Sequence, residues 1–212
     1  MKNKEFYALG IMSGTSIDGL DFSLIKSDGK DKIQILINHY FKFSPKIKLK
    51  INDFIKKNQL SYNFSKNSSS YERINREFSL YLLKKIKFFF SLNNFDMDDV
   101  DVIGIHGNTI LHRPSKGFSI QLGSAKMIAE KLKKPIVCNF RNKDISLGGE
   151  GAPLVPVFHR AIFSKRNNNI VVINIGGISN FTFLEGEKNI FASDIGPGNS
   201  LIDKLCIKYF KK

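Results

Sequence analysis

The sequence of 212 residues contains no tryptophan and only two cysteines, Cys138 and Cys206. These two lack CxxC spacing and metal-ligand neighbours, which favours reduced, unpaired thiols over a disulfide framework or a zinc site. No apolar run approaches the roughly 18–20 residues of a membrane-spanning helix. The opening residues 1–16 carry two lysines and a brief apolar run, but no small-residue cleavage pattern. We therefore expect a first strand there rather than a leader, and a cytoplasmic globular protein without membrane association.

Acidic residues are scarce: 19 Asp and Glu stand against 33 Lys and Arg, a net charge of +14. Clustered basic residues would favour nucleic-acid binding, because they neutralise phosphates. The alternative is a surface filled with lysine by biased codon usage, since Lys, Asn, Ile and Phe are all abundant. The lysine-rich stretches 46–50 and 84–87 lie inside helical patterns, where they form solvated faces. We expect anionic ligands in general, but no nucleic-acid partner.

The hydrophobic pattern predicts an α/β fold. Alternating apolar runs predict a meander of three antiparallel strands, over residues 5–12, 20–25 and 33–41. Apolar residues at three- and four-residue spacing then predict helices over 49–55 and 71–90. Further along, we expect a strand at 100–105, a turn at 106–108, a helix at 124–133, a strand at 135–138 and a glycine-rich loop at 146–151. This order is that of ribonuclease-H-like and actin-like lobes, in which helices cover a mixed sheet.

A second unit is predicted to begin at residue 168. Its segment VVINIGGISNFTFL repeats the strand, glycine turn and returning strand of LGIMSGTSIDGLDFSL near the start of the chain. A strand leading to Asp194 and a helix over 200–209 follow. We therefore expect a first lobe at residues 1–167 and the beginning of a second, incomplete lobe at residues 168–212.

The first candidate site is the segment from Ser13 to Gly19. Its glycines allow close approach of a ligand, and its hydroxyls and backbone N–H groups suit an anion such as a phosphate. An ordinary hairpin turn of the same composition is the alternative. Asp18 would either bind Mg²⁺ through water or cap the turn.

Two further segments offer groups for a polar ligand. His106 follows a predicted buried strand, and Asn108 and Thr109 supply donors and acceptors for sugar hydroxyls. A histidine that bonds a backbone carbonyl in a turn is the alternative. Arg141 can bind a carboxylate or phosphate through two hydrogen bonds, and Gly149 and Glu150 belong to a loop whose backbone can approach a small ligand.

Asp194 is the candidate catalytic base. It is predicted to end a short strand just before a glycine-rich turn and a helix N-terminus, where a carboxylate can accept a proton while helix amides hold an anion. A turn or N-cap aspartate is the alternative, although Asn199 suits the cap position better.

Six segments, taken in order, closely resemble anhydro-N-acetylmuramic acid kinases, which are actin-like sugar kinases of peptidoglycan recycling. They are MSGTSIDGLD, IHGNTILHRP, QLG, NFRNKDISLGGEGAPLVPVFHRAIF, NIGGISN and DIGPGNSLID. The resemblance implies a kinase that uses ATP, Mg²⁺ and water to convert 1,6-anhydro-N-acetylmuramic acid into N-acetylmuramic acid 6-phosphate. It implies Asp194 as catalytic base and an ATP-binding loop made of Ser13, Gly14, Thr15, Ser16, Ile17, Asp18, Gly19 and Leu20. It also implies His106, Asn108, Thr109, Arg141, Gly149 and Glu150 as sugar-binding residues.

The sequence departs from the family pattern at three positions. Asn108 and Glu150 stand where the family usually has Gln, and Asn139 where it usually has Asp. The chain also ends before the family's adenosine-binding segment. This leaves two alternatives, a non-catalytic remnant or one half of a split kinase. The expected protein partner is a second copy of the chain, in a homodimer, or a partner chain that supplies the missing lobe. A basic nucleic-acid-binding protein is the third, but a nuclease needs converging carboxylates, and only Asp18, Asp21 and the distant Asp194 are candidates.

Overall fold

The structure is a computed structural model that describes residues 4–58, 68–163, 168–186 and 188–210. The chain forms two compact units, residues 1–148 and 149–212. This division comes earlier than the predicted lobe boundary at 167/168, which adjoins residues 164–167 outside the described part. Helix α5 (Pro156–Phe163) packs on strands of the second unit and therefore belongs to it.

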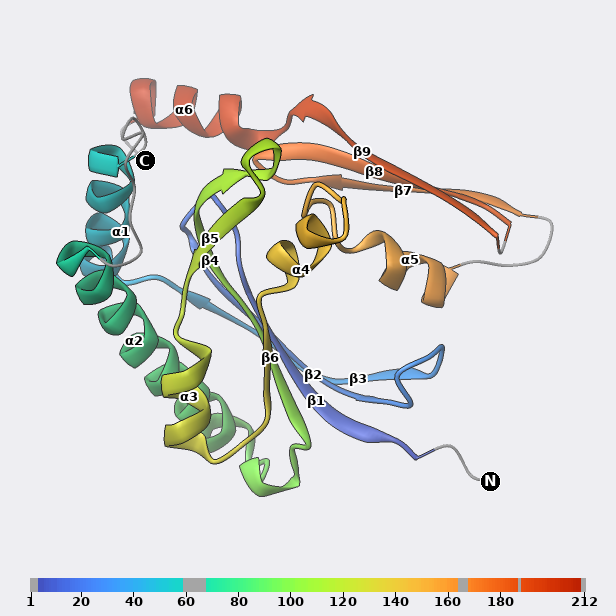
Figure 1. Ribbon diagram of the computed structural model, residues 1–212, viewed down its shortest axis with the longest axis horizontal. Coiled ribbons are helices and arrows are strands. Elements are labelled where there is room, and N and C mark those ends of the chain that lie inside the picture. The colour runs from blue at the N-terminus through green and yellow to red at the C-terminus, as the bar shows by residue number, and fades with distance from the viewer. Residues whose placement is uncertain (1–3, 59–67, 164–167, 187, 211–212) are drawn as a thin grey trace. The chain divides into compact units, whose positions relative to one another are not determined.

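The first unit is built on a six-stranded mixed sheet (Figure 1). Its strands are β1 (Phe6–Ser13), β2 (Gly19–Ser27), β3 (Ile33–Lys42), β4 (Val102–Arg113), β5 (Phe118–Leu122) and β6 (Ile136–Cys138). The order is β3-β2-β1-β4-β5, with β6 also paired to β4. The first three strands form the predicted antiparallel meander, while β4 runs parallel to both β1 and β6. The predicted mixed sheet of a ribonuclease-H-like or actin-like lobe is thus confirmed.

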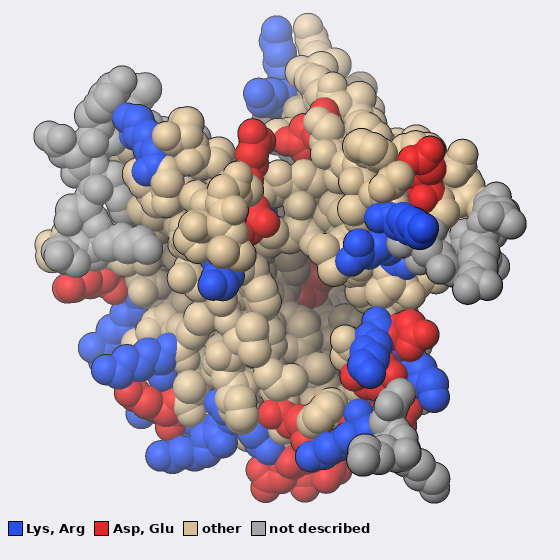
Figure 2. Space-filling model, turned by 45° about the vertical axis from the view of Figure 1, so that its right-hand side comes forward, with Lys and Arg blue, Asp and Glu red and all other residues tan. Residues whose placement is uncertain are grey.

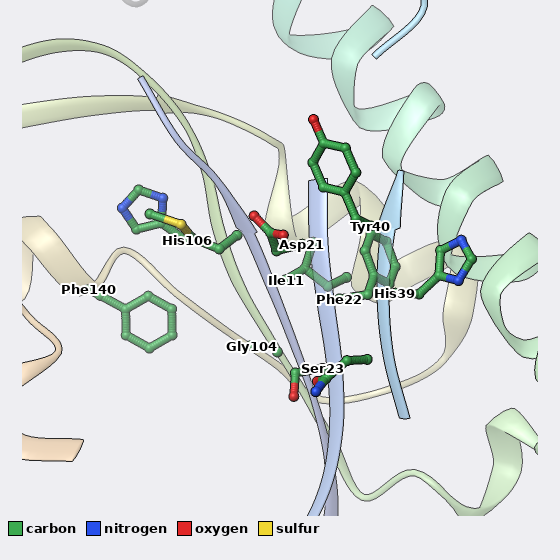
Figure 3. Close-up of a pocket in the computed structure, with 12 residues that line it drawn as sticks. Ile11, Asp21, Phe22, Ser23, His39, Tyr40, Gly104, His106 and Phe140 are labelled. Carbon is green, nitrogen blue, oxygen red and sulfur yellow. The ribbon is translucent and has the colours of Figure 1, made fainter. Parts of the chain in front are cut away.

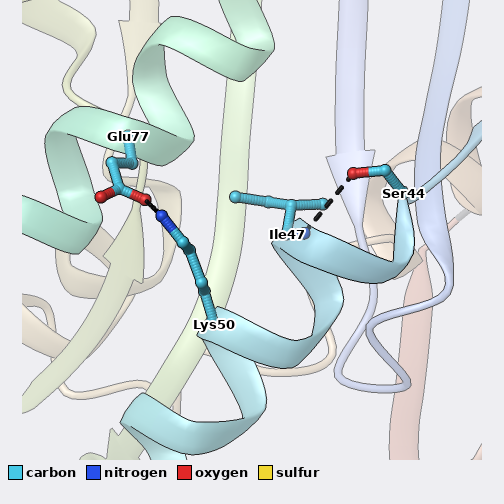
Figure 4. Close-up of polar contacts among 4 residues, drawn as sticks. All are labelled: Ser44, Ile47, Lys50 and Glu77. Carbon is cyan, nitrogen blue, oxygen red and sulfur yellow. Dashed lines mark hydrogen bonds and ion pairs between the residues drawn. The ribbon is translucent and has the colours of Figure 1, made fainter.

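In the described part of this unit, four helices and two short 3-10 helices accompany the sheet: α1 (Pro45–Asn58), α2 (Ser69–Asn93), η1 (Met97–Asp99), η2 (Pro114–Lys116), α3 (Ala125–Leu132) and α4 (Phe140–Ser146). Serine side chains cap three of the helices by accepting a backbone N–H of the first turn. At the start of α1, the Ser44 hydroxyl accepts a hydrogen bond from the N–H of Ile47 (Figure 4). One turn later, Lys50 of α1 forms an ion pair with Glu77 of α2. Ser68 caps α2 and Ser124 caps α3 in the same way.

One face of the first sheet forms the core. Strand alternation turns Leu9 and Ile11 of β1 and Phe22 of β2 to that face, where all three are buried. Helix α2 covers it with an apolar stripe that includes Phe78 and Phe89, and the rings of Phe22 and Phe89 lie 5.3 Å apart. Burial of each such side chain stabilises the fold by roughly 1.5–3 kcal/mol.

The second unit contains α5, then β7 (Asn169–Ile175), β8 (Ile178–Glu185), β9 (Asn189–Pro197) and α6 (Asn199–Phe210). The three strands form an antiparallel sheet in the order β7-β8-β9. The predicted hairpin and the helix over 200–209 are therefore confirmed.

One prediction about secondary structure was wrong, and two elements were not predicted. Residues 106–108 do not form a turn, because β4 continues through them to Arg113. The helix α4 and the strand β5 were not predicted. The error at 106–108 has a physical origin: Gly107 has a φ of 77°, and the strand uses it in a bulge rather than in a turn.

Three further features concern the length of the helices, the cysteines and the surface charge. Among the described residues, no helix is both long and apolar enough to cross a membrane. Cys138 and Cys206 are free thiols. Figure 2 shows basic side chains interspersed with acidic ones and with broad uncharged areas, which is the distribution expected for a solvated lysine-rich surface.

Candidate functional site

The turn between β1 and β2 is a short loop with its own hydrogen bonds. The N–H of Ile17 donates to the carbonyl of Gly14 at 3.3 Å. The carboxylate of Asp18 accepts from the Ser16 hydroxyl at 2.8 Å and from the N–H of Gly19 at 2.9 Å. Asp18 therefore caps the turn, while Thr15 and Ser16 remain exposed at its tip.

The loop is also fixed by the core beneath it. Ile17 has a φ of 52°, a conformation that a β-branched residue rarely adopts, yet its side chain is buried. The N–H of Phe43 donates to the carbonyl of Asp18 at 2.8 Å. At Gly19, a Cβ atom would lie 2.5 Å from the carbonyl oxygen of Phe41 and from the Tyr40 ring. The packing of β3 thus requires this glycine, whatever the loop binds.

Asn108 supports the loop from β4. Its side-chain amide donates to the Ser13 hydroxyl at 2.9 Å and to the carbonyl of Gly14 at 3.0 Å. The residue is fully buried, and its Oδ1 atom has no hydrogen-bond partner among the described residues. Asn108 was predicted to contact a sugar, but the structure places its amide behind the loop that was predicted to bind phosphate.

Thr109 lies next to this support and is also buried. Its hydroxyl accepts a hydrogen bond of 3.4 Å from Gln121 on β5. Gln121 in turn donates to Ser119 at 2.6 Å, so β4 and β5 are joined by side chains as well as by backbone pairing. Gln121 belongs to the QLG segment, but sequence analysis gave it no role.

His106 occupies the bulge in β4. The pairing with β1 passes from Ile105 to Gly107, so His106 is the additional residue. The imidazole Nδ1 lies 2.8 Å from the carbonyl of Gly107, and Nε2 accepts a hydrogen bond of 2.9 Å from Nε of Arg141. A carbonyl can only accept, so Nδ1 carries the proton and Nε2 is the acceptor. Burial lowers the pKa of His106, as does the charge of Arg141, and both favour this neutral form.

Arg141 reaches His106 because α4 is fastened to β5. Asn142, the next residue, accepts from the N–H of Ser119 at 2.7 Å and donates to its carbonyl at 2.8 Å. It also donates to Asn139, which precedes the helix in a left-handed conformation with a φ of 63°. Sequence analysis missed Asn142, since a single asparagine gives no signal of tertiary pairing in the sequence.

A pocket of about 560 Å³ opens on the sheet face opposite the core. His106 and the ring of Phe140 lie on one side of it and Tyr40 on the other (Figure 3). Asp21 of β2 also lines it, and burial together with the charge of Asp18 raises the pKa of Asp21. The pocket thus combines an aromatic wall with a neutral histidine and a carboxylate.

The other predicted residues belong to the second unit. Asp194 is exposed and lies within β9 opposite Asn180, not at the strand end as predicted, because β9 continues to Pro197. Gly149 and Glu150 lie outside helices and strands at the start of the unit, where Glu150 is exposed.

Two other side chains of the second unit have structural partners. Asn199 is the first residue of α6, and its side chain donates to the carbonyl of Ile175 at 3.0 Å. His159 of α5 bonds to Thr182 of β8, which supports a structural role.

The whole sequence from residue 6 to residue 212 matches the family model described as anhydro-N-acetylmuramic acid kinase. The chain belongs to this family. A curated anhydro-N-acetylmuramic acid kinase of Rhodopseudomonas palustris (strain ATCC BAA-98 / CGA009) is 36% identical over 208 residues, with 97% of this chain and 56% of the relative covered. Another, of Bradyrhizobium diazoefficiens, is 37% identical over 207 residues, with 92% and 54% covered. The chain therefore spans about half the length of the curated relatives it matches.

Solved structures show more distant likenesses. A Ppx/GppA family member of Aquifex aeolicus has a TM-score of 0.41 and 13% identity, with 99% of this chain and 56% of that chain covered. A reductive activator for a corrinoid, iron–sulfur protein has a TM-score of 0.43 and 14% identity, with 93% and 32% covered.

Proposed function

We propose that this chain supplies the phosphate-binding lobe, and the beginning of the second lobe, of an ATP-dependent kinase. The reaction would convert 1,6-anhydro-N-acetylmuramic acid, ATP and water into N-acetylmuramic acid 6-phosphate during cytoplasmic peptidoglycan recycling. The observation that carries the proposal is the support of the Ser13–Gly14 turn by Asn108. In a member of a kinase family, a loop whose conformation is fixed by such hydrogen bonds suits a ligand that must be positioned accurately.

ATP fits the loop from Ser13 to Leu20 in its chemistry. Exposed Thr15 and Ser16 hydroxyls lie at the tip of a turn whose shape is fixed from below. Bound ATP supplies the phosphoryl group, and the role of these residues is to hold its phosphates. Mg²⁺ that accompanies ATP needs only one or two protein carboxylates. Asp18 and Asp21 are close enough to interact and are our candidates for holding it.

The sugar side of the proposal rests on His106 and Arg141. Neutral His106 accepts a hydrogen bond at its Nε2 from Nε of Arg141, at 2.9 Å, and so fixes that part of the guanidinium. Arg141 is then oriented for the carboxylate of the muramic acid, which an arginine binds through two parallel hydrogen bonds. Thr109, Gly149 and Glu150 remain candidates for the sugar, and Asn108 contributes through the loop.

Asp194 is the proposed general base. Its carboxylate would take a proton from the water that attacks the anomeric carbon, while the bond from that carbon to O6 breaks. O6 would then attack the terminal phosphorus of ATP, the bond from that phosphorus to the bridging oxygen would break, and ADP would leave. The carboxylate of Asp194 is exposed, so a water molecule can reach it.

A remnant without catalytic activity, or one half of a split kinase, is the second candidate. Because the chain spans 56% of the Rhodopseudomonas relative, its activity has to be measured on this chain itself. The two candidates differ in whether the purified chain forms sugar phosphate by itself.

The test has two measurements. In the first, the chain is incubated with Mg-ATP and anhydro-sugar, alone and together with the part of a relative that this chain does not match. Sugar phosphate should form in at least one arm, and Asp194→Asn should reduce the rate by about 10²–10⁴-fold. Product from the chain alone would rule out the remnant, whereas no product in either arm would contradict the kinase proposal.

The second measurement is titration calorimetry with a non-hydrolysable ATP analogue. Gly14→Asp places a carboxylate in the loop and should weaken binding at least tenfold, because like charges repel. Gly29→Asp adds the same charge at an open glycine turn between β2 and β3 and serves as the matched control. Equal affinities of the two variants would contradict phosphate binding by this loop.

A further inference from the structure

Helix α4 has little apolar contact to hold it in place. All seven of its residues are described, and Ile145 alone among them is buried. Asn139, which precedes the helix, makes no side-chain cap hydrogen bond. The ring of Phe140 lies over Gly104 of β4, where an added Cβ atom would be 3.7 Å from it. A helix of about two turns is unstable by itself, so polar contacts with the sheet must fix the position of α4.

Asn142 supplies these contacts through its side-chain amide. Its Oδ1 accepts from the N–H of Ser119 at 2.7 Å, and its Nδ2 donates to the Ser119 carbonyl at 2.8 Å and to Oδ1 of Asn139 at 2.7 Å. Ser119 belongs to β5, and within the described residues no strand other than β4 pairs with β5. By bonding both backbone groups of one residue, the amide of Asn142 takes the place of a neighbouring strand at this edge of the sheet.

Ser119 is itself held by its surroundings. The residue is 0% exposed. Its hydroxyl accepts a hydrogen bond of 2.6 Å from Gln121 and donates one of 3.3 Å to the carbonyl of Leu111 on β4. A buried residue with these partners cannot move without breaking the bonds. The pairing with Asn142 therefore fixes α4 to a rigid point of the sheet.

Arg141 and Asn142 are consecutive residues, so the helix turns their side chains roughly 100° apart. Asn142 contacts β5, and Arg141 contacts the neighbouring strand β4, where its Nε donates to Nε2 of His106 at 2.9 Å. Figure 3 shows His106 on the same side of the pocket as Phe140, the residue before Arg141. A shift of α4 by one residue moves it about 1.5 Å along its axis, which is more than a hydrogen bond tolerates. Such a shift would break both contacts together.

We infer that Asn142 is a positioning residue for Arg141. By pairing with Ser119 it fixes α4 at the edge of β5, so that Arg141 stays on His106 and is oriented for an anionic group of the substrate. Asn142 acts through Arg141 and not by contact with the substrate. The inference rests on the proposed function for the identity of that group, the carboxylate of the muramic acid. An arginine already held in one conformation loses less freedom on binding, so the pairing raises the affinity for the carboxylate.

The first measurement follows the hydrogen bond between Arg141 and His106 by heteronuclear NMR and needs no substrate. Asn142→Leu keeps the volume but removes the pairing with Ser119. We expect hydrogen exchange at Nε of Arg141 to become about tenfold faster. Burial lowers the pKa of His106, and so does the charge of Arg141, so the pKa of His106 should rise in the variant. Asn142→Ala, in which water can reach Ser119, should show the same changes if the leucine variant folds poorly.

Asn75→Leu is the matched control. Asn75 of α2 is half-buried, like Asn142, and its Oδ1 accepts from the N–H of Gly123, directly after β5, at 2.8 Å. It therefore also joins a helix to the sheet region. Its loss should lower the stability of the chain but leave the exchange at Arg141 and the pKa of His106 unchanged. This control separates a general loosening of the fold from the positioning of Arg141.

The second measurement is titration calorimetry with 1,6-anhydro-N-acetylmuramic acid and with 1,6-anhydro-N-acetylglucosamine, which lacks the lactyl carboxylate. Asn142→Leu should weaken binding of the acidic sugar about tenfold and leave binding of the neutral sugar unchanged. A wild-type chain that binds neither sugar would contradict the sugar side of the proposed function. The NMR comparison would still decide whether Asn142 holds Arg141 on His106.

Three outcomes would overturn the inference. One is an exchange rate at Arg141 and a pKa of His106 that stay unchanged in both Asn142 variants. Another is the same change in Asn75→Leu as in Asn142→Leu. The third is binding of the acidic sugar that Asn142→Leu weakens no more than binding of the neutral one, because the effect would then not pass through the carboxylate.

Discussion

The side-chain amide of Asn108 donates a hydrogen bond of 2.9 Å to the hydroxyl of Ser13, 95 positions earlier in the sequence. It joins the middle of β4 to the end of β1, and both residues are buried. A buried hydrogen bond between a strand and a loop fixes the loop more firmly than an exposed one, because neither partner can exchange it for water.

Replacement of Asn108 tests this support. Asn108→Leu keeps the volume but leaves the Ser13 hydroxyl and the Gly14 carbonyl without their donor. We expect the free energy of unfolding to fall by about 1–3 kcal/mol, measured by urea denaturation. Asn38→Leu, at an exposed asparagine of β3, is the control and should stay within about 0.5 kcal/mol. Equal stability of the two variants would show that the support contributes nothing.

Gly19→Ala should destabilise the protein through packing alone. The added Cβ would approach the Phe41 carbonyl and the Tyr40 ring to 2.5 Å, so β3 must move. We expect a loss of about 1–3 kcal/mol in thermal or chemical unfolding. Gly10→Ala is the matched control, because its nearest contact is an ordinary 3.8 Å. A Gly19→Ala variant as stable as Gly10→Ala would contradict the tight packing.

The neutral state of His106 predicts a dependence of stability on pH. Burial lowers the pKa of His106 in the folded chain below its ordinary value of about 6.5. The unfolded chain then binds the proton first, so stability falls as the pH drops below about 6.5 towards the folded pKa. The loss amounts to at most about 1.4 kcal/mol for each unit of lowering.

Urea midpoints at pH 7.5 and pH 5.0 measure this loss. The wild-type chain should lose more stability between the two values than His106→Gln does. His112→Gln, at an exposed histidine on the same strand, should behave as the wild type. A His106→Gln variant with the wild-type dependence would show that this histidine is not the group responsible.

The ion pair between Lys50 and Glu77 should contribute little to stability. The two side chains are 40% and 36% exposed, so water screens their attraction. A double-mutant cycle with Lys50→Met and Glu77→Gln should give a coupling energy of about 0.2–1 kcal/mol that decreases in 1 M salt. A coupling above about 2 kcal/mol, or one insensitive to salt, would contradict this expectation.

The sequence predicted the elements whose periodicity is continuous. Apolar and polar residues alternate in β1 and β2, and apolar residues form a stripe along α2, because each element is buried on one face. Burial on one face therefore shows directly in the spacing of apolar residues. The loop from Ser13 to Gly19 was found for a similar reason, since glycine and hydroxyl residues after an apolar strand are a local signal.

The tertiary structure decided what these local signals mean. In the sequence, Gly107 predicts a turn. In the structure, β4 continues through Gly107 and forms a bulge, because its parallel pairing with β1 skips His106. In the sequence, Asn108 is a candidate for ligand contact. In the structure, the pairing of β4 with β1 places its side chain beside Ser13, where it supports the loop. The motifs alone indicated the family, and the pairing of distant strands determined which residues support the loop.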